Sequence, residues 1–126
     1  MRRVVRTGGF EDVGGYARAV RIEDAVAVSG TAAIGPNGAA LHPGDAYAQT
    51  RDAFERALAA LRELGGGLTD VIRTRIYLAP GTDWNASVAA HRELFGEKPP
   101  ANTTLFVAGF VAQGVLVEVE LDARIS

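Results

Sequence analysis

The sequence predicts a single α+β domain in which two amphipathic helices cover one face of a β-sheet. Three observations support this fold class. The chain has 126 residues and no low-complexity linker, which suits one domain spanning residues 1–126. Two segments repeat apolar residues at helical spacing. Shorter segments between and around them have the alternating, β-branched composition of strands.

Extended segments dominate the N-terminal part of the chain. Arg3–Arg6 is expected to form a short first strand, because glycines follow it closely. Ala17–Ile22 and Ala25–Ser29 are two strand-like runs separated by Glu23-Asp24, and this arrangement predicts a hairpin. Gly30 ends the hairpin, and the glycine- and proline-rich residues 35–44 predict a loop.

The first helix is expected between Asp45, which can cap it, and the glycine run at residues 65–67. Its apolar residues recur at helical spacing and form one stripe: Tyr47, Phe54, Leu58, Leu61 and Leu64.

The second helix is expected to begin after Thr82 or Asp83 and to end at Gly96. Its apolar stripe comprises Trp84, Val88, His91 and Phe95. Trp84 is predicted to lie in the core, and His91 is predicted to be a hydrogen-bonded packing residue rather than a catalytic base.

Three further strands are expected over residues 71–78, 102–108 and 115–123. In the last of them, Val117, Val119 and Leu121 alternate with Glu118 and Glu120. The valine row belongs under the helices, so the carboxylates lie on the opposite face. That face is either ordinary solvent-exposed sheet or a subunit interface with polar pockets, and periodicity does not separate the two.

Composition narrows the classes of function. The net charge is −2, and the 13 basic residues are interleaved with 15 acidic ones, so we expect no nucleic-acid partner. The apolar stretches are too short for a membrane span, and no secretory signal is recognisable, so we expect a cytoplasmic protein. There is no cysteine and only two histidines, far apart in the sequence, so we expect no metal site.

An ordered set of short motifs resembles the Rid family, the reactive intermediate deaminases also called YjgF-like. The motifs occur in the family's order and cover nearly the whole chain: Gly15-Tyr16-Ala17-Arg18-Ala19-Val20, Val28-Ser29-Gly30-Thr31, Gln49-Thr50-Arg51, Asp70 to Leu78, Phe95-Gly96 through Pro99-Pro100-Ala101, and Leu116-Val117-Glu118-Val119-Glu120. No motif is specific alone, and the resemblance depends on their order.

The resemblance implies a chorismate-mutase-like fold with a mixed sheet, assembled as a homotrimer with clefts between subunits. It also implies cofactor-free hydrolysis of enamines and imines to oxo compounds and ammonia. Glu118 matches the family's water-positioning glutamate, Tyr16 its pocket tyrosine, and Gly30 the pocket wall. The chain departs from the pattern at Pro100-Ala101-Asn102-Thr103, where deaminases carry an arginine that clamps the substrate carboxylate; here Asn102 occupies that position. The resemblance is therefore to a branch that lacks this arginine, in which a charge-assisted contact is missing.

Two further residues are candidates for substrate binding. Arg18 lies two residues after Tyr16 in an extended run, so both side chains are expected on one face. Arg18 either supplies the guanidinium that Asn102 lacks or makes an intersubunit or surface salt bridge. Thr104 alternates onto the same face as Asn102, so the two are expected to share an environment.

Two functions from different classes remain open. The first is a cofactor-free hydrolase that acts on an imine, an enamine or a related small reactive metabolite. The second is a non-catalytic trimer that binds a small molecule in order to sense or sequester it. Both need the same pocket, so the sequence does not separate them. RNA cleavage is not expected, because the chain has no basic stripe.

Overall fold

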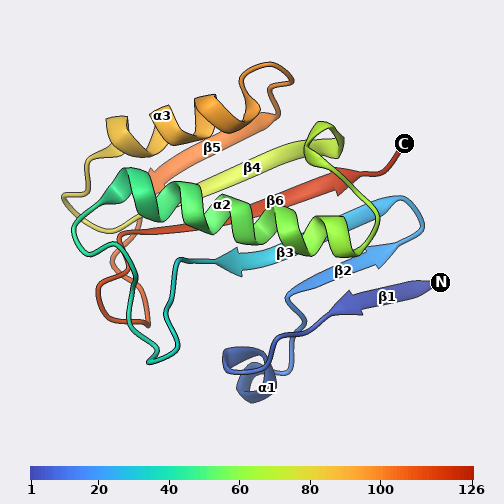
Figure 1. Cartoon of the computed structure of the whole chain (residues 1–126), viewed down its shortest axis with the longest axis horizontal. Coiled ribbons are helices and arrows are strands. Elements are labelled where there is room, and N and C mark those ends of the chain that lie inside the picture. The colour runs from blue at the N-terminus through green and yellow to red at the C-terminus, as the bar shows by residue number, and fades with distance from the viewer.

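The computed structural model describes residues 1–126 and has two layers, a six-stranded sheet and two main helices (Figure 1). The strands run in the order β1-β2-β3-β6-β4-β5. Their bounds are β1 Arg2–Val5, β2 Ala19–Ile22, β3 Ala25–Thr31, β4 Val71–Leu78, β5 Ala101–Phe106 and β6 Val117–Arg124. Only β4 and β5 pair in parallel, so the sheet is mixed.

Both main helices, α2 (Ala46–Glu63) and α3 (Trp84–Phe95), lie on the same face of the sheet (Figure 1). Each begins after an aspartate whose side chain accepts a hydrogen bond from an amide of the first turn. The distance is 3.0 Å at Asp45 and 3.2 Å at Asp83. The predicted α+β layer arrangement is therefore confirmed. Neither helix has the length and apolar character needed to cross a bilayer.

The hydrophobic core lies between the helices and the sheet. Alternate residues of β6 are buried there, including Val117, Val119 and Leu121, while Glu118 and Glu120 point to the open face. The predicted alternation of this strand is confirmed. Because its buried row is packed against α2, the backbone of β6 is a firm support for the side chains on the open face.

The prediction that Trp84 lies in the core is wrong, because its side chain is 50% exposed. The buried face of α3 includes Ser87 and Ala90, which are small enough to let this helix approach α2 closely. The hydroxyl of Ser87 hydrogen-bonds that of Thr50 on α2 at 2.7 Å. Trp84 therefore lies at the edge of the packed face, at the start of the helix.

A bulge interrupts the pairing of β3 with β6. Val28 pairs with Leu121, but Thr31 pairs with Val119, so β3 has one extra residue across this interval. Gly30 lies within this irregular stretch. A β-bulge bends its strand and redirects the neighbouring side chains and carbonyls, and here it does so beside β6.

A short helix, α1 (Phe10–Gly14), precedes β2 and is absent from the sequence-based expectation. It ends at Gly15, whose φ of 72° lies in the left-handed region that glycine adopts without strain. The backbone oxygen of Glu11 accepts hydrogen bonds from the amides of Gly15 and Tyr16. A five-residue helix is too short to show a periodic apolar stripe, so periodicity gave no signal for it.

Candidate functional site

Four of the six predicted site residues lie close together on one part of the molecule. The guanidinium of Arg18 donates a 2.6 Å hydrogen bond to the carbonyl oxygen of Gly30. The same guanidinium lies 5.9 Å from the ring centroid of Tyr16, within the range of a cation–π contact. A methyl group added at Gly30 would overlap the carboxylate oxygen of Glu118. The end of β3, the segment before β2 and the start of β6 therefore meet here.

Glu118 is the acidic residue of this cluster. Its side chain is partly buried and has no salt-bridge partner within the chain. Burial raises the pKa of Glu118, the nearby positive charge of Arg18 lowers it, and the negative charge of Glu120 raises it, with a net upward shift. A carboxyl group with a raised pKa holds its proton to higher pH than an exposed one, which suits it to donate a proton and take it back in general acid–base catalysis.

Arg18 is held on two sides. Besides its bond to Gly30, it forms an ion pair at 3.8 Å with Glu11 on α1, and the side chain of Glu11 is only 2% exposed. Burial alone would raise the pKa of Glu11, but hydrogen bonds from Thr7 and the charge of Arg18 outweigh it and lower the pKa. Glu11 is therefore an ionised carboxylate beneath the guanidinium. The ion pair of Arg18 is thus with a buried carboxylate of its own chain and is neither the intersubunit nor the surface salt bridge predicted as one alternative.

The other two predicted residues, Asn102 and Thr104, form a separate group on β5. The hydroxyl of Thr104 donates to the amide oxygen of Asn102 at 2.8 Å, which confirms that they share an environment. The amide nitrogen of Asn102 donates to the hydroxyl of Thr74 on β4 at 3.0 Å. Thr74 in turn lies 2.7 Å from Nε2 of His91 on α3.

A single chain does not bring the two groups together. Asn102 pairs with Thr74, whose side chain is fully buried on the helix-covered face of the sheet. Glu118 pairs with Tyr77 and points to the open face. The two groups therefore lie on opposite faces of the sheet and on strands separated by β4.

His91 is a packed side chain, as predicted. Its ring lies between Phe54 and Phe95, at centroid distances of 5.4 and 4.8 Å. Burial lowers the pKa of His91, so it is neutral at physiological pH. The hydroxyl of Thr74 accepts from the amide of Asn102 and also shares a hydrogen bond with Nε2 of His91, in which the donor is set by the tautomer of the ring.

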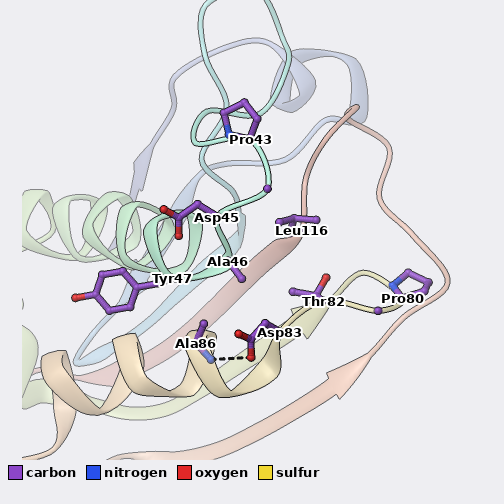
Figure 2. Close-up of a pocket in the computed structure, with 11 residues that line it drawn as sticks. Pro43, Asp45, Ala46, Tyr47, Pro80, Thr82, Asp83, Ala86 and Leu116 are labelled. Carbon is purple, nitrogen blue, oxygen red and sulfur yellow. Dashed lines mark hydrogen bonds between the residues drawn. The ribbon is translucent and has the colours of Figure 1, made fainter.

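A cleft of about 600 Å³ lies elsewhere, between the N-terminal ends of α2 and α3 (Figure 2). It is lined by Asp45, Thr82, Asp83 and Leu116 among others, and by none of the six predicted site residues. Both carboxylates serve as helix caps, and neither forms a salt bridge. No group of three acidic or histidine side chains in the molecule is arranged to hold a metal ion.

Sequence reasoning missed Glu11 and Thr74. Glu11 lies in a segment bounded by two glycine pairs, Gly8-Gly9 and Gly14-Gly15. Glycine pairs indicate turns and give no signal for the short helix that carries Glu11. A buried hydroxyl between a histidine and an asparagine, as at Thr74, needs the tertiary contacts of β4 with β5 and α3. No local pattern indicates such a contact.

Comparison with known proteins gives consistent relatives. A family model described as Endoribonuclease L-PSP matches residues 9–125. An uncharacterized protein of Streptomyces coelicolor is 44% identical over 124 residues, covering 98% of this chain and 91% of that protein. The 3-aminoacrylate deaminase RutC of Acinetobacter baylyi is 34% identical over 110 residues, covering 87% of this chain and 86% of that protein.

A solved structure agrees with the sequence relatives. It is that of a Mycobacterium tuberculosis member of the highly conserved YjgF/YER057c/UK114 family, with a TM-score of 0.88 and 40% identity over 99% of this chain and 100% of that one. The order of strands and helices, the extent of the family match and the two full-length similarities point the same way. The chain belongs to the Rid/YjgF/L-PSP family.

Proposed function

We propose that this protein is a cofactor-free hydrolase that deaminates an imine, an enamine or a related small reactive metabolite. The observation that carries the proposal is Glu118, a partly buried carboxyl group with a raised pKa, no salt-bridge partner, and the backbone of Gly30 directly beside it. The similarity to a 3-aminoacrylate deaminase, itself named for an enamine substrate, supports the same class of reaction.

The chemistry follows from what a single carboxyl group can do. Protonated Glu118 donates its proton to the carbon of an enamine, which converts the C=C–N unit to an iminium ion. The resulting carboxylate then accepts a proton from water as the water oxygen bonds to the iminium carbon. Glu118, protonated again by this water, gives the proton to the amino group of the carbinolamine. As the C–N bond breaks and ammonia leaves, the hydroxyl proton returns to Glu118 and a carbonyl compound remains. An imine enters the same sequence by protonation on nitrogen.

We propose that the substrate binds between subunits of a homotrimer. Tyr16, Arg18 and Gly30 would surround Glu118 from one subunit, and Asn102 and Thr104 would come from β5 of a neighbour. This arrangement is supported by the separation of the two groups onto opposite faces in one chain, since only a second copy can bring them to one place. Light scattering tests it: a mass equal to one 13.2-kDa subunit at micromolar concentration refutes the shared site.

Asn102 bears on whether the substrate carries a carboxylate. Its amide carries no charge, and its nitrogen already donates to Thr74, so it offers no charge-assisted contact to a carboxylate. We therefore propose a substrate without a free carboxylate at that end. The same observation favours a second candidate, a trimer that binds a metabolite without converting it.

Ammonia release distinguishes the two candidates. The substrates are 3-aminoacrylate, 2-aminoacrylate and a panel of imines generated in situ, and the variants are Glu118→Gln and Asn102→Arg. The control is Asp122→Asn, a carboxylate farther along the same face of β6, which pairs with Arg75 at 3.1 Å. We expect the wild type to turn over substrate and Glu118→Gln to be at least a hundredfold slower. The control should stay within about threefold of the wild-type rate. Binding without turnover by the wild type would favour the second candidate.

A further inference from the structure

Glu11 is a buried charge with one cationic partner. Its carboxylate accepts a 2.8 Å hydrogen bond from the amide of Thr7 and a second bond from the Thr7 hydroxyl. Its only ion pair is with Arg18. A buried carboxylate is costly unless it is paired and hydrogen-bonded, so this geometry fixes the position of Arg18 as much as Arg18 stabilises Glu11.

We propose that Glu11 is a positioning residue of the candidate site: it holds the guanidinium of Arg18 on the carbonyl oxygen of Gly30 and withholds it from the carboxyl group of Glu118. Arg18 is then a structural clamp on the bulge of β3 rather than a free binding group for an anion. The catalytic consequence of this role rests on the proposed function, whereas the placement of Arg18 does not.

The short helix α1 connects Glu11 to both Arg18 and Tyr16. The side chain of Glu11 reaches Arg18, and its backbone oxygen accepts from the amide of Tyr16 at 3.1 Å. The ring of Tyr16 packs against Gly14, where an added methyl group would lie 2.9 Å from ring carbons, and it also faces Arg18. One turn of helix therefore places both the aromatic ring and the cation beside Glu118.

The effect on Glu118 has a definite direction. The charged or titratable groups that face it are Arg18, Glu120 on its own strand and Tyr77 on β4. Arg18 is the only cation among them. If Glu11 no longer held it, the guanidinium would lose its only ion-pair partner and shift toward Glu118, whose carboxyl group its charge already affects. A salt bridge there would lower the pKa of Glu118 and favour the ionised form.

The test measures the pKa of Glu118 through a pH titration, observed by carbon-13 NMR of its carboxyl group in the assembled protein. Glu11→Gln keeps the shape of the side chain and can still accept the Thr7 amide, but it removes the charge. We expect the pKa of Glu118 to fall in this variant and to rise in Arg18→Met, which removes the cation. Asp12→Asn is the matched control, because Asp12 lies on the same helix and pairs only with the exposed Arg6. We expect no change there.

A double variant identifies the route of the effect. If Glu11 acts through Arg18, then Glu11→Gln in the Arg18→Met background leaves the pKa of Glu118 where Arg18→Met puts it. Arg18→Met leaves the buried carboxylate of Glu11 without its cation, so if that variant fails to fold, the double variant is compared with wild type and should show the same rise in the pKa of Glu118. A further change in the double variant, or a Glu11→Gln titration that matches Asp12→Asn, overturns the proposal.

The activity readout separates this proposal from the proposed function. Where the protein deaminates, the acid–base transition in its pH–rate profile should move to lower pH in Glu11→Gln and to higher pH in Arg18→Met. Where no substrate is turned over, the proposed function fails, but the NMR titration still decides the role of Glu11.

Discussion

The buried hydroxyl of Thr74 links three elements, and its removal should be costly. Thr74 on β4 is 0% exposed, accepts from Asn102 on β5 and shares a hydrogen bond with His91 on α3. Thr74→Val replaces the hydroxyl by a methyl group of similar size, so it removes two hydrogen bonds without creating a cavity.

The magnitude follows from what each partner can do afterwards. Asn102 is exposed and can bond to water, so its loss is about 0.5 kcal/mol. Nε2 of His91 is partly buried among phenylalanine rings and is left without its hydrogen-bond partner, which costs about 1.5 kcal/mol. The free energy of unfolding should therefore fall by about 2 kcal/mol. For a chain of 126 residues this corresponds to a decrease of about 8 °C in the melting temperature.

Urea unfolding at one fixed protein concentration measures this difference, because the concentration dependence of an oligomer then cancels. Thr104→Val is the matched control. It removes a hydroxyl that also bonds Asn102, but from a more exposed position, and it should cost less than about 0.5 kcal/mol. A Thr74→Val protein within that same margin of wild type would refute the stabilising role of the hydrogen bond between Thr74 and His91.

Three further predictions concern the site, a helix cap and pH. Gly30→Ala should push the carboxyl group of Glu118 aside and reduce turnover at least tenfold at nearly unchanged stability, whereas Gly109→Ala, where an added methyl group meets open space, should change neither. Asp83→Ala should lower the free energy of unfolding by about 1 kcal/mol, measured by urea, because it removes the cap of α3. Burial lowers the pKa of His91 from 6.5, so the unfolded chain binds a proton more readily than the folded one. The stability attributable to His91 should therefore be complete above about pH 6.5 and decline below it. In His91→Phe, the urea midpoint should depend less on pH over that range.

The layers of the fold were predictable because long periodic segments carry their own signal. α2, α3 and β6 each bury one face, and each was expected at nearly its observed bounds. Asp45 was a correct cap because an aspartate before an apolar helical stripe has a local physical role. The exposure of Trp84 was not predictable, since it depends on how closely Ser87 lets α3 approach α2.

The candidate site was predictable only in part, for a similar reason. Tyr16 and Arg18 were expected on one face from strand alternation, and their contact is consistent with that expectation. The proximity of Gly30 to Glu118 depends on a bulge between β3 and β6, which no local pattern specifies. The role of Glu11 was not predictable from the sequence, because it depends on α1, which brings Glu11 to its partner Arg18.

The packing of β6 on one face and the surroundings of Glu118 on the other explain how this fold can support chemistry without weakening its core. Val117 and Val119 are fully buried under α2, so the backbone that carries Glu118 between them is fixed by packing. The surroundings of Glu118, by contrast, come from the backbone of Gly30 and the side chain of Arg18, neither of which belongs to the hydrophobic core cluster. Changes in these surroundings alter the protonation and accessibility of one carboxyl group and leave the hydrophobic layer intact. The reactivity of the site should therefore be adjustable at α1 and at the bulge, while the strand that bears the reacting group stays the same.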